Sequence, residues 1–258
     1  MISSLAYVHP NARLGENVTV EPFAFIDDNV VIGDNTWVGP NSTIMYGARI
    51  GKECRIFPSA VVSAIPQDLK FNGEETTAEI GDRTTIREGT TVNRGTSSTG
   101  KTVVGSDCLL MAYSHVAHDC ILGNNVIIGN TTGLAGEVKV ADWAIISGGS
   151  LVHQFVRIGA HVMAGGGARI RIDVPPYVLA DREPLSYMGV NKIGLSRRGF
   201  DQEKINEIHE IYRVIYLSKK NLTQALETVK NEFEPSRERD HIIDFFNSSE
   251  RGVIRARV

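Results

Sequence analysis

Aliphatic residues recur at every sixth position over more than half of the chain. Val, Leu or Ile occupies 24 of the 28 positions of this series between residues 8 and 170. The exceptions are Asp68, Glu74, Ser98 and Ala164, and the first three fall in polar or glycine-containing stretches that are typical of loops. Because the phase never changes, the series describes one continuous architecture.

A period of six predicts a parallel β-helix. Three six-residue sides close one triangular coil of about 18 residues, and successive coils hydrogen-bond about 4.8 Å apart. The recurring aliphatic side chains then stack inside the coils as a continuous core. Gly33, Asn35, Gly39 and Asn41 suit corners with positive φ. An α-helix does not fit, since residues six apart lie about 240° apart around its axis.

Two segments interrupt the series and are predicted to leave the coils as loops. They lie at 63–79 and 93–103, and each interruption is a multiple of the period. Loops on a rigid scaffold often carry ligand-binding groups, so Gln67, Asp68, Lys70 and Arg94 are candidates. The alternative for each of them is a solvated loop side chain.

The pattern changes after Ile170, where Pro175 and Pro176 end the coils. Asp201 is a suitable N-cap for an amphipathic helix, and two further helices are predicted over 222–233 and 237–246. The apolar residues of the first helix are Ile205, Ile208, Ile211, Tyr212 and Ile215. We therefore predict a mainly β chain, with a β-helix domain over residues 1–190 and a C-terminal α-helical domain over residues 191–258.

Composition and charge exclude several classes of protein. The net charge of −3 gives no basic field for nucleic acid. Three cysteines without Cys-x-x-Cys spacing fit reduced thiols better than disulfides. The chain has neither a signal-peptide pattern nor an uncharged apolar stretch of about 18 residues, so we predict a cytoplasmic protein without a transmembrane segment.

The run from Ser114 to Cys120 concentrates the candidate chemistry, because it holds His115, His118 and Asp119. A histidine beside a carboxylate is a good general base, although an isolated histidine is more often structural. Zinc held by these histidines and His153 is disfavoured, since no cysteine or acidic ligand has a recognised spacing. We expect no metal site.

Nine short runs, taken together, resemble one family of hexapeptide-repeat acyltransferases. The runs are Gln67-Asp-Leu-Lys70, Glu79-Ile-Gly-Asp-Arg83, Val104-Gly-Ser-Asp107, Ser114-His-Val-Ala-His-Asp-Cys120, Ala144-Ile-Ile146, Val152-His-Gln-Phe155, Gly159-Ala-His-Val-Met163, Asp173-Val-Pro-Pro-Tyr177 and Arg197-Arg-Gly-Phe200. In this order they resemble the UDP-N-acetylglucosamine acyltransferase family of lipid A biosynthesis over nearly the whole chain. The hexapeptide repeat alone is much less specific, because many acyltransferases carry it.

The resemblance implies a left-handed β-helix that assembles as a homotrimer with active sites between subunits. It also implies transfer of an (R)-3-hydroxyacyl group from acyl carrier protein to the glucosamine 3-position of a UDP-sugar. No cofactor is implied, because the acyl donor arrives on the phosphopantetheine of the carrier protein. The implied partners are therefore the carrier protein, the UDP-sugar and two further copies of the chain.

The same resemblance assigns roles to individual residues. His118 would be the general base, Asp119 its partner, and the backbone N–H of Gly136 the donor that stabilises an oxyanion. Gly166 would be the acyl-chain ruler and, having no side chain, would favour donors of roughly 14 carbons or more; alternatively it serves a tight corner. The implied substrate-binding residues are Asp68, Lys70, His115, His153, Gln154, Asn191, Arg197 and Arg198.

Departures from the family pattern leave the acceptor open. Glu137 stands where the best-known members have a histidine, Ile193 stands where they have a glutamate, and Arg182 and Glu183 replace a Gly-Asn turn. The acceptor could therefore carry a 3-hydroxyl or a 3-amine. Acidic carrier proteins need basic docking sites, and the candidate patch is Arg169 with Arg171, unless these are ordinary solvated residues.

Other functions compete with this interpretation. One is a CoA-dependent hexapeptide acetyltransferase, and another is a catalytically silent β-helix that only binds carrier protein or assembles other subunits. The related N-acyltransferase of the same pathway is disfavoured, because it has an additional N-terminal uridine-binding domain and the repeat here begins at Val8.

Overall fold

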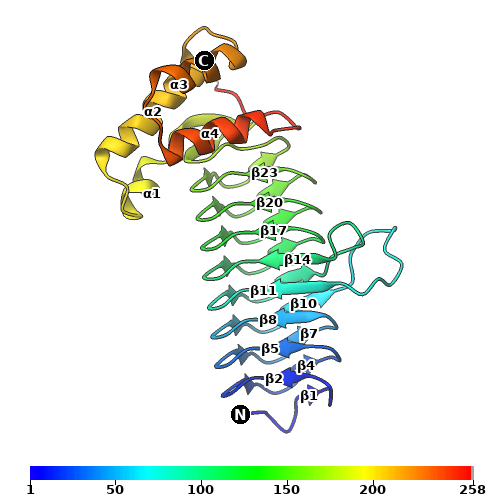
Figure 1. The fold of residues 1–258 in the computed structure, drawn as a ribbon. Helices are drawn as coiled ribbons and strands as arrows, with labels where there is room; N and C mark the ends of the chain where they lie inside the picture. The colour runs from blue at the N-terminus through cyan, green and yellow to red at the C-terminus, as the bar shows by residue number, and fades with distance from the viewer. Residues whose placement is uncertain (257–258) are drawn as a thin grey trace.

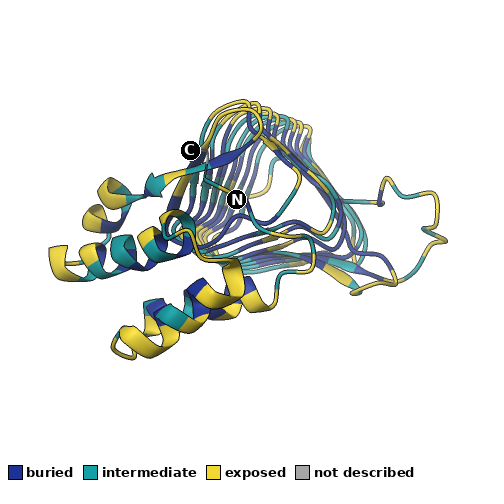
Figure 2. Cartoon of the chain, turned by 90° about the horizontal axis from the view of Figure 1, so that it is seen from above, coloured by how far each residue is buried: buried dark blue, intermediate teal, exposed yellow. Residues whose placement is uncertain are grey.

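The chain forms a triangular rod of stacked coils with a helical domain at its C-terminal end (Figure 1). The computed structural model describes residues 1–256. Viewed along the rod, three sheets enclose a triangular interior, and one corner carries the projecting loops (Figure 2). We refer to the sheets as I, II and III, and to each corner by the two sheets that meet there.

The three sheets are built mostly from two-residue strands. Sheet I has nine strands: β1 (Tyr7–Val8), β4 (Phe25–Ile26), β7 (Thr43–Ile44), β10 (Val61–Ala64), β13 (Thr91–Asn93), β16 (His115–Val116), β19 (Gly133–Leu134), β22 (Leu151–Val152) and β25 (Arg169–Ile170). Sheet II has eight: β2 (Arg13–Leu14), β5 (Val31–Ile32), β8 (Ala48–Ile50), β11 (Thr77–Ile80), β14 (Lys101–Val104), β17 (Ile121–Leu122), β20 (Lys139–Val140) and β23 (Arg157–Ile158). Sheet III has ten: β3 (Thr19–Val20), β6 (Trp37–Val38), β9 (Arg55–Ile56), β12 (Thr85–Ile86), β15 (Leu109–Leu110), β18 (Ile127–Ile128), β21 (Ile145–Ile146), β24 (Met163–Ala164), β26 (Val178–Asp181) and β27 (Ser186–Val190).

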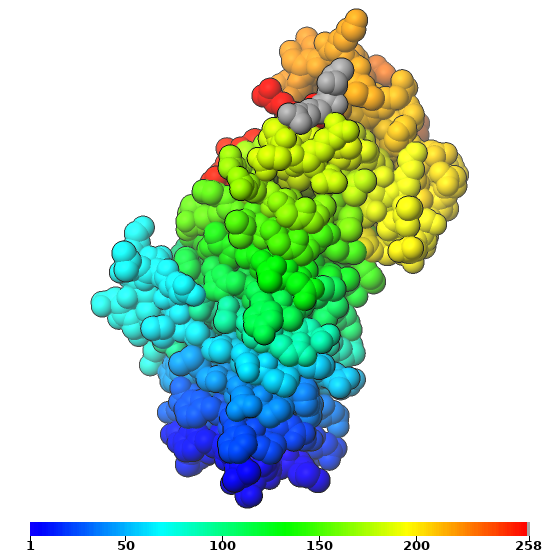
Figure 3. Space-filling view, turned by 180° about the vertical axis from the view of Figure 1, so that it is seen from behind, coloured from blue at the N-terminus to red at the C-terminus, as the bar shows by residue number. Residues whose placement is uncertain are grey.

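The register of the strands confirms the predicted coil and its two interruptions. Val8 pairs with Ile26, which is 18 residues later in the chain. Across the first loop, Val62 pairs with Val92, which is 30 residues later. Both loops leave the rod at corner I/II, at 65–76 and 94–100, between strands β10 and β11 and between β13 and β14. Figure 3 shows the first loop standing out from the rod.

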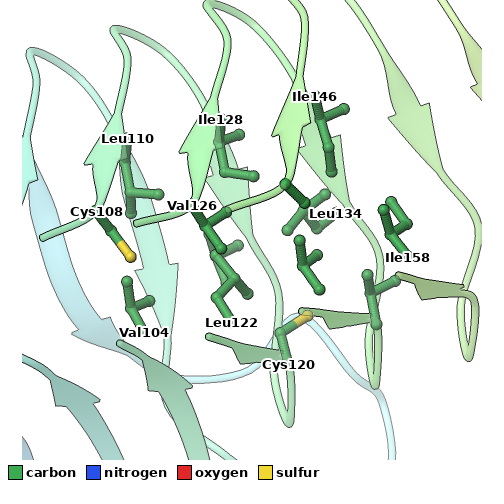
Figure 4. Packing of buried hydrophobic residues seen from close by; sticks show 14 of the residues in the cluster. Val104, Cys108, Leu110, Cys120, Leu122, Val126, Ile128, Leu134, Ile146 and Ile158 are labelled. Carbon is green, nitrogen blue, oxygen red and sulfur yellow. The ribbon is translucent and has the colours of Figure 1, made fainter. Parts of the chain in front are cut away.

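The aliphatic ladder fills the interior of the rod, as the period predicts. Ile26, Ile56, Ile86 and Ile128 have no solvent-exposed surface. Figure 4 shows such side chains from successive coils stacked on one another. Burial of each large aliphatic side chain stabilises the fold by about 1.5–3 kcal/mol, so the ladder is the main source of stability.

The corner glycines have a different role from the one predicted. Asn35 and Asn41 adopt positive φ, at 58° and 57°. Gly33 and Gly39 do not, so the prediction of positive φ is wrong for them. A Cβ at residue 33 would lie 2.7 Å from the carbonyl carbon of Gly51, and one at residue 39 would lie 2.8 Å from the carbonyl oxygen of Ile56. Glycine is required there because the next coil lies too close for a side chain.

The C-terminal domain, described over residues 191–256, contains four helices: α1 (Lys192–Arg197), α2 (Gln202–Leu217), α3 (Leu222–Glu232) and α4 (Arg237–Asn247). Asp201 caps α2 by accepting a hydrogen bond of 2.7 Å from the Lys204 N–H, and all five predicted apolar residues of α2 are buried. Helices α3 and α4 agree with prediction to within one residue. Helix α1 and the antiparallel hairpin β26–β27 were not predicted, because neither continues the period nor forms a long amphipathic pattern.

Helix α4 lies against the last coils of sheet II. The Arg157 guanidinium lies 4.5 Å from the centre of the Phe245 ring and donates a 2.8 Å hydrogen bond to the carbonyl of Ser248. The tail then returns to the rod, where Asp173 bridges to Val253. Within residues 1–256, no helix is both long enough and apolar enough to cross a membrane.

Candidate active site

His118 lies at corner I/II, because β16 ends at Val116 and β17 begins at Ile121. His118, Gly136 and Gln154 are spaced 18 residues apart, so they occupy equivalent positions in successive coils. The Glu137 N–H donates a 3.0 Å hydrogen bond to the carbonyl of His118, which fixes the two coils relative to each other. The repeat thus stacks these three candidate residues along one edge of the rod.

The His118 imidazole is oriented by Asp119. Its Nδ1 lies 2.7 Å from Oδ2 of Asp119, whose side chain has no exposed surface. The same carboxylate accepts hydrogen bonds from the backbone and hydroxyl groups of Thr96 and Thr99. Burial raises the pKa of Asp119, but the hydrogen bonds from Thr99, Thr96 and His118 outweigh it and hold that pKa below its ordinary value.

The protonation of the pair follows from this arrangement. An ionised carboxylate can only accept, so Nδ1 of His118 carries a proton, and in the neutral imidazole Nε2 then has a free lone pair. Nε2 lies 3.8 Å from Oδ2 of Asp68, which belongs to the first loop. Nε2 of His118 and Oδ2 of Asp68 then face each other as two hydrogen-bond acceptors, and a hydrogen-bond donor of the substrate can lie between them. A hydroxyl placed there could lose its proton to Nε2.

Gly136 lies directly against the imidazole. A Cβ at this position would lie 2.5 Å from Cε1 and 2.6 Å from Nε2 of His118. Its φ lies outside the left-handed region, so close approach rather than backbone conformation requires glycine. Among residues 1–256, no group accepts a hydrogen bond from the Gly136 N–H, and this donor is therefore available to an anionic oxygen.

Other predicted residues surround this corner. His115 points outward from β16, and its Nδ1 lies 2.7 Å from the hydroxyl of Thr91. Burial, with a smaller effect of nearby His118, lowers the pKa of His115. Lys70 follows Asp68 in the loop and is exposed, and its N–H donates a 2.9 Å hydrogen bond to Oδ1 of Asp68.

His153 lies on the same edge, one coil beyond Gly136 and next to Gln154. Its Nδ1 is 3.2 Å from the guanidinium of Arg251 and 3.2 Å from the carbonyl of Gln154. The guanidinium donates and the carbonyl accepts, so the two contacts belong to different tautomers of the ring. Sequence analysis missed Arg251, since nothing in the pattern indicates that the C-terminal tail returns to this corner.

Asn191, Arg197 and Arg198 lie at corner II/III instead. Arg197 and Arg198 line a pocket of about 370 Å³ together with Trp143 and His161. Arg198 places Nη1 3.3 Å from Nδ1 of His161 and lies 5.4 Å from the centre of the Trp143 ring. Asn191 donates a 2.9 Å hydrogen bond to the carbonyl of His161. Sheet II therefore separates two clusters that the resemblance assigns to one substrate.

His161 is a second residue that sequence analysis missed. Burial, reinforced by Arg198, lowers the pKa of His161 to about 4. The ring stacks on Tyr177 and Trp143, with centroid distances of 5.6 and 6.3 Å. The run from Gly159 to Met163 contains it, but only the folded chain shows that it contacts both Asn191 and Arg198.

The remaining predicted positions lie at other places on the rod. Gly166 is exposed at corner III/I, where an added Cβ would be 3.5 Å from the nearest heavy atom, the carbonyl oxygen of Gly148. Its φ is not left-handed, so a side chain fits. Glu137 lines a pocket of about 230 Å³ beside Gly136, with Phe155 and Arg251. Ile193 is 70% exposed.

Metal binding finds no support in the residues that the structure describes. Within 1–256, no three His, Cys, Asp or Glu side chains come close enough together to hold an ion. The three cysteines, Cys54, Cys108 and Cys120, are buried free thiols, and burial raises the pKa of each of them.

Two protein families match parts of the chain. Residues 173–254 match the second domain of UDP-N-acetylglucosamine O-acyltransferase, and residues 29–64 and 101–136 match the bacterial transferase hexapeptide repeats. Among curated proteins, the acyl-[acyl-carrier-protein]–UDP-N-acetylglucosamine O-acyltransferase of Stenotrophomonas maltophilia is 43% identical, over 98% of this chain and 97% of that protein. The enzyme of the same name from Verminephrobacter eiseniae is 51% identical, over 65% of this chain and 64% of that protein.

Solved structures agree over the full length. The UDP-N-acetylglucosamine acyltransferase of Bacteroides fragilis superposes with a TM-score of 0.97 and 55% identity, over 99% of this chain and 100% of that one. The enzyme from Francisella novicida gives 0.96 and 37%, over 99% of this chain and 94% of that one. The chain therefore belongs to the UDP-N-acetylglucosamine O-acyltransferase family and has its fold, a left-handed parallel β-helix with a C-terminal helical domain.

Proposed function

We propose that the protein transfers an (R)-3-hydroxyacyl group from acyl carrier protein to the 3-hydroxyl of UDP-N-acetylglucosamine, the first step of lipid A biosynthesis. The observation that carries the proposal is the placement of His118: buried Asp119 contacts its Nδ1, Asp68 faces its Nε2, and its ring lies against Gly136, whose N–H has no hydrogen-bond acceptor among residues 1–256. General base and oxyanion donor thus lie side by side.

The proposed reaction is a direct acyl transfer. The sugar 3-oxygen attacks the thioester carbonyl carbon while Nε2 of His118 takes the hydroxyl proton. The carbonyl oxygen becomes an oxyanion, which the Gly136 N–H stabilises. The intermediate collapses by breaking the C–S bond, and His118 returns the proton to the departing thiolate of the carrier's phosphopantetheine. This route needs neither an acyl-enzyme nor a resident cofactor.

A homotrimer would combine the two clusters of candidate residues. If sheet I of one copy packs on sheet III of the next around a three-fold axis, corner I/II of the first meets corner II/III of the second. His118 and Gly136 of one subunit would then share a substrate with Asn191, Arg197 and Arg198 of its neighbour. Arginines suit the diphosphate of a UDP-sugar.

The outer surfaces of the sheets support this packing. Sheet III presents a ladder of aligned apolar side chains on its outer face: Leu109, Ile127, Ile145, Met163 and Leu179. Sheet I presents Phe25, Val61 and Leu151. At the corresponding positions sheet II carries five charged residues, Arg13, Arg49, Glu79, Lys139 and Arg157, and three apolar ones, Val31, Val103 and Ile121. Of the charged residues, Arg157 packs against helix α4. Sheet II therefore suits solvent, and the other two suit neighbouring subunits.

The carrier protein would dock near the last coils, where Arg169 and Arg171 are both exposed in the single chain. Arg169 pairs with Leu151 on sheet I, so in the proposed trimer this patch would lie at the border of the subunit interface. Their charge complements an acidic partner. The three buried free thiols are compatible with the reducing cytoplasm, where we place the reaction.

The direct test is incubation with UDP-N-acetylglucosamine and a hydroxyacyl carrier protein of defined chain length, followed by mass spectrometry. The expected product is the acylated UDP-sugar, and hydroxylamine should cleave it because it is an ester. His118→Ala should fold normally and lower kcat/KM by about 10²–10⁴. Normal turnover by folded His118→Ala protein would refute the mechanism.

Two parallel reactions separate the alternatives. Replacing the sugar with its 3-amino analogue tests for an amide product, which resists hydroxylamine. Replacing the carrier-bound donor with acetyl-CoA or the matching hydroxyacyl-CoA tests for a CoA-dependent enzyme. If kcat/KM is clearly higher with the 3-amino sugar or with a CoA-bound donor, the proposed substrate pair is wrong and that substitute is the preferred substrate.

A further inference from the structure

Arg94 is buried, although its position in the second loop suggests a ligand-binding side chain. Only 9% of its surface is exposed. Its guanidinium lies between two aromatic rings, 5.4 Å from the centre of Tyr46 and 5.3 Å from the centre of Phe71. Tyr46 belongs to the rod and Phe71 to the first loop, so Arg94 joins the loop to the rod.

The backbone at Arg94 holds the beginning of the same loop. The Arg94 N–H donates a 2.9 Å hydrogen bond to the carbonyl of Ala64, and the Asn93 side chain donates a 3.1 Å bond to the carbonyl of Ile65. Nη1 of Arg94 also lies 3.3 Å from the carbonyl of Tyr46. The first loop is therefore fixed both where it leaves the rod and at Phe71.

Phe71 is linked to Asp68 by a tight turn. The Phe71 N–H donates a 3.0 Å hydrogen bond to the carbonyl of Asp68, and the Lys70 N–H bonds to its carboxylate. Asp68 in turn lies 3.8 Å from Nε2 of His118. Direct contacts therefore lead from Arg94 through Phe71 and Asp68 to the imidazole of His118.

The same short segment also supports the carboxylate on the other side of the imidazole. Thr96 and Thr99 donate to Asp119, which bonds to Nδ1 of His118. Residues 93–99 therefore position both carboxylates that face His118, Asp119 through hydroxyl and backbone donors and Asp68 through Arg94 and Phe71.

We propose that Arg94 is a positioning residue for acyl transfer, which holds Asp68 beside Nε2 of His118 by clamping Phe71 against Tyr46. The inference rests on the proposed function. It also explains why an arginine with a buried, unpartnered Nε stands here, because a planar guanidinium can stack on two rings at once. A lysine at this position keeps the charge but loses the planar contact.

The test compares Arg94→Lys and Phe71→Leu with the wild type. Both variants should lower kcat/KM by about tenfold to a hundredfold, the effect expected when a group beside the reacting atoms is displaced by about 1 Å. Both should speed hydrogen exchange of the loop amides over 67–75. Arg87→Lys is the matched control, because Arg87 also stacks on a ring, Phe57 at 4.6 Å, but lies away from the loop. It should retain activity and loop protection.

A double-mutant comparison separates positioning from general stability. In an Asp68→Ala background, the carboxylate that Arg94 and Phe71 are proposed to position is absent. Adding Arg94→Lys or Phe71→Leu to this background should therefore change kcat/KM less than twofold. Full, additive losses in that background would overturn the proposal, as would unchanged loop exchange in both folded single variants. Phe71→Leu keeps the test decisive if Arg94→Lys does not fold.

Failure of this inference is distinguishable from failure of the proposed function. If the wild type transfers no acyl group, the function is refuted, while hydrogen exchange still reports whether Arg94 clamps the loop. If the wild type is active but neither variant loosens the loop or lowers kcat/KM, only the clamp is refuted.

Discussion

Gly136 and His118 lie so close together that a single methyl group on Gly136 would stand 2.5 Å from Cε1 of the imidazole. Real side chains do not tolerate this distance, so Gly136→Ala must displace the ring or the coil. We expect Gly136→Ala to lower kcat/KM by about 10²–10⁴, as loss of the general base would. Thermal melting should show a smaller effect, about 1–3 kcal/mol from overpacking. Full activity in folded Gly136→Ala protein would contradict the close packing of the catalytic imidazole against Gly136.

Mixing two inactive variants tests whether active sites lie between subunits. His118→Ala and Arg198→Ala should each be nearly inactive alone. If one site takes His118 from one subunit and Arg198 from the next, co-assembly at equal amounts should restore about a quarter of the wild-type sites. Sites contained in one chain would recover no activity. Sedimentation equilibrium of the wild type gives the matching control, since a fully active monomer would also exclude shared sites.

Reversing charge at the proposed docking patch should weaken the encounter with carrier protein. We expect Arg169→Glu combined with Arg171→Glu to raise KM for the carrier-bound donor several-fold at low ionic strength, with kcat little changed. Added salt should reduce the difference between the two proteins, because it screens exposed charges. An unchanged KM at low ionic strength would place the docking surface elsewhere.

The stability of the C-terminal half should fall on acidification because of His161. Its pKa is about 4 in the folded chain, against an ordinary value of 6.5. Between these pH values the unfolded chain binds a proton at this histidine that the folded chain does not bind. The contribution of His161 to the free energy of unfolding is therefore fully present above about pH 6.5 and is lost as the pH falls toward 4. Melting temperatures of the wild type should therefore decline across this range.

Comparison with His161→Gln isolates this contribution from those of His115 and His241, whose pKa values are also lowered by burial. The variant should melt below the wild type at pH 7, because it loses the ring stacking, and the gap should narrow by pH 4.5. A gap that stays constant or widens would contradict the assignment.

The length of the acyl chain should depend on Gly166. Its open surroundings admit a side chain, and its φ does not require glycine. We expect the wild type to prefer donors of roughly 14 carbons or more, because each buried methylene contributes about 0.8 kcal/mol. Gly166→Met should shift the preference toward about ten carbons. An unchanged profile of kcat/KM against chain length, in protein with a normal melting temperature, would place the ruler at another residue.

The period of six was sufficient to predict the rod, because it reports directly which residues point inward. Val8, Ile26 and Ile44 follow one another at the predicted spacing and align in neighbouring strands. The reason for Gly33 and Gly39 could not be predicted in this way. Their requirement for glycine comes from the coil above, which sequence spacing does not describe.

The candidate site was predicted only in part, because its support comes from residues without a distinctive pattern. His118 and Asp119 stand out as adjacent chemistry, whereas Thr96 and Thr99 look like ordinary loop residues. Arg94 has the charge of a surface residue and is nevertheless buried. Folding also separated Arg198 from His118, because Arg198 follows helix α1 and lies against His161 at the other edge of sheet II.

His118 and Gly136 lie on consecutive coils, so the rise from one coil to the next sets the distance between these two catalytic groups. Backbone hydrogen bonds, not side-chain packing, set the rise between them at about 4.8 Å. Mutations that repack the interior leave this spacing nearly unchanged, whereas inserting one whole coil between them would double it without disturbing the fold. The regular spacing of the coils therefore fixes the distance between the general base and the oxyanion donor. The aliphatic core can vary in sequence without changing this distance.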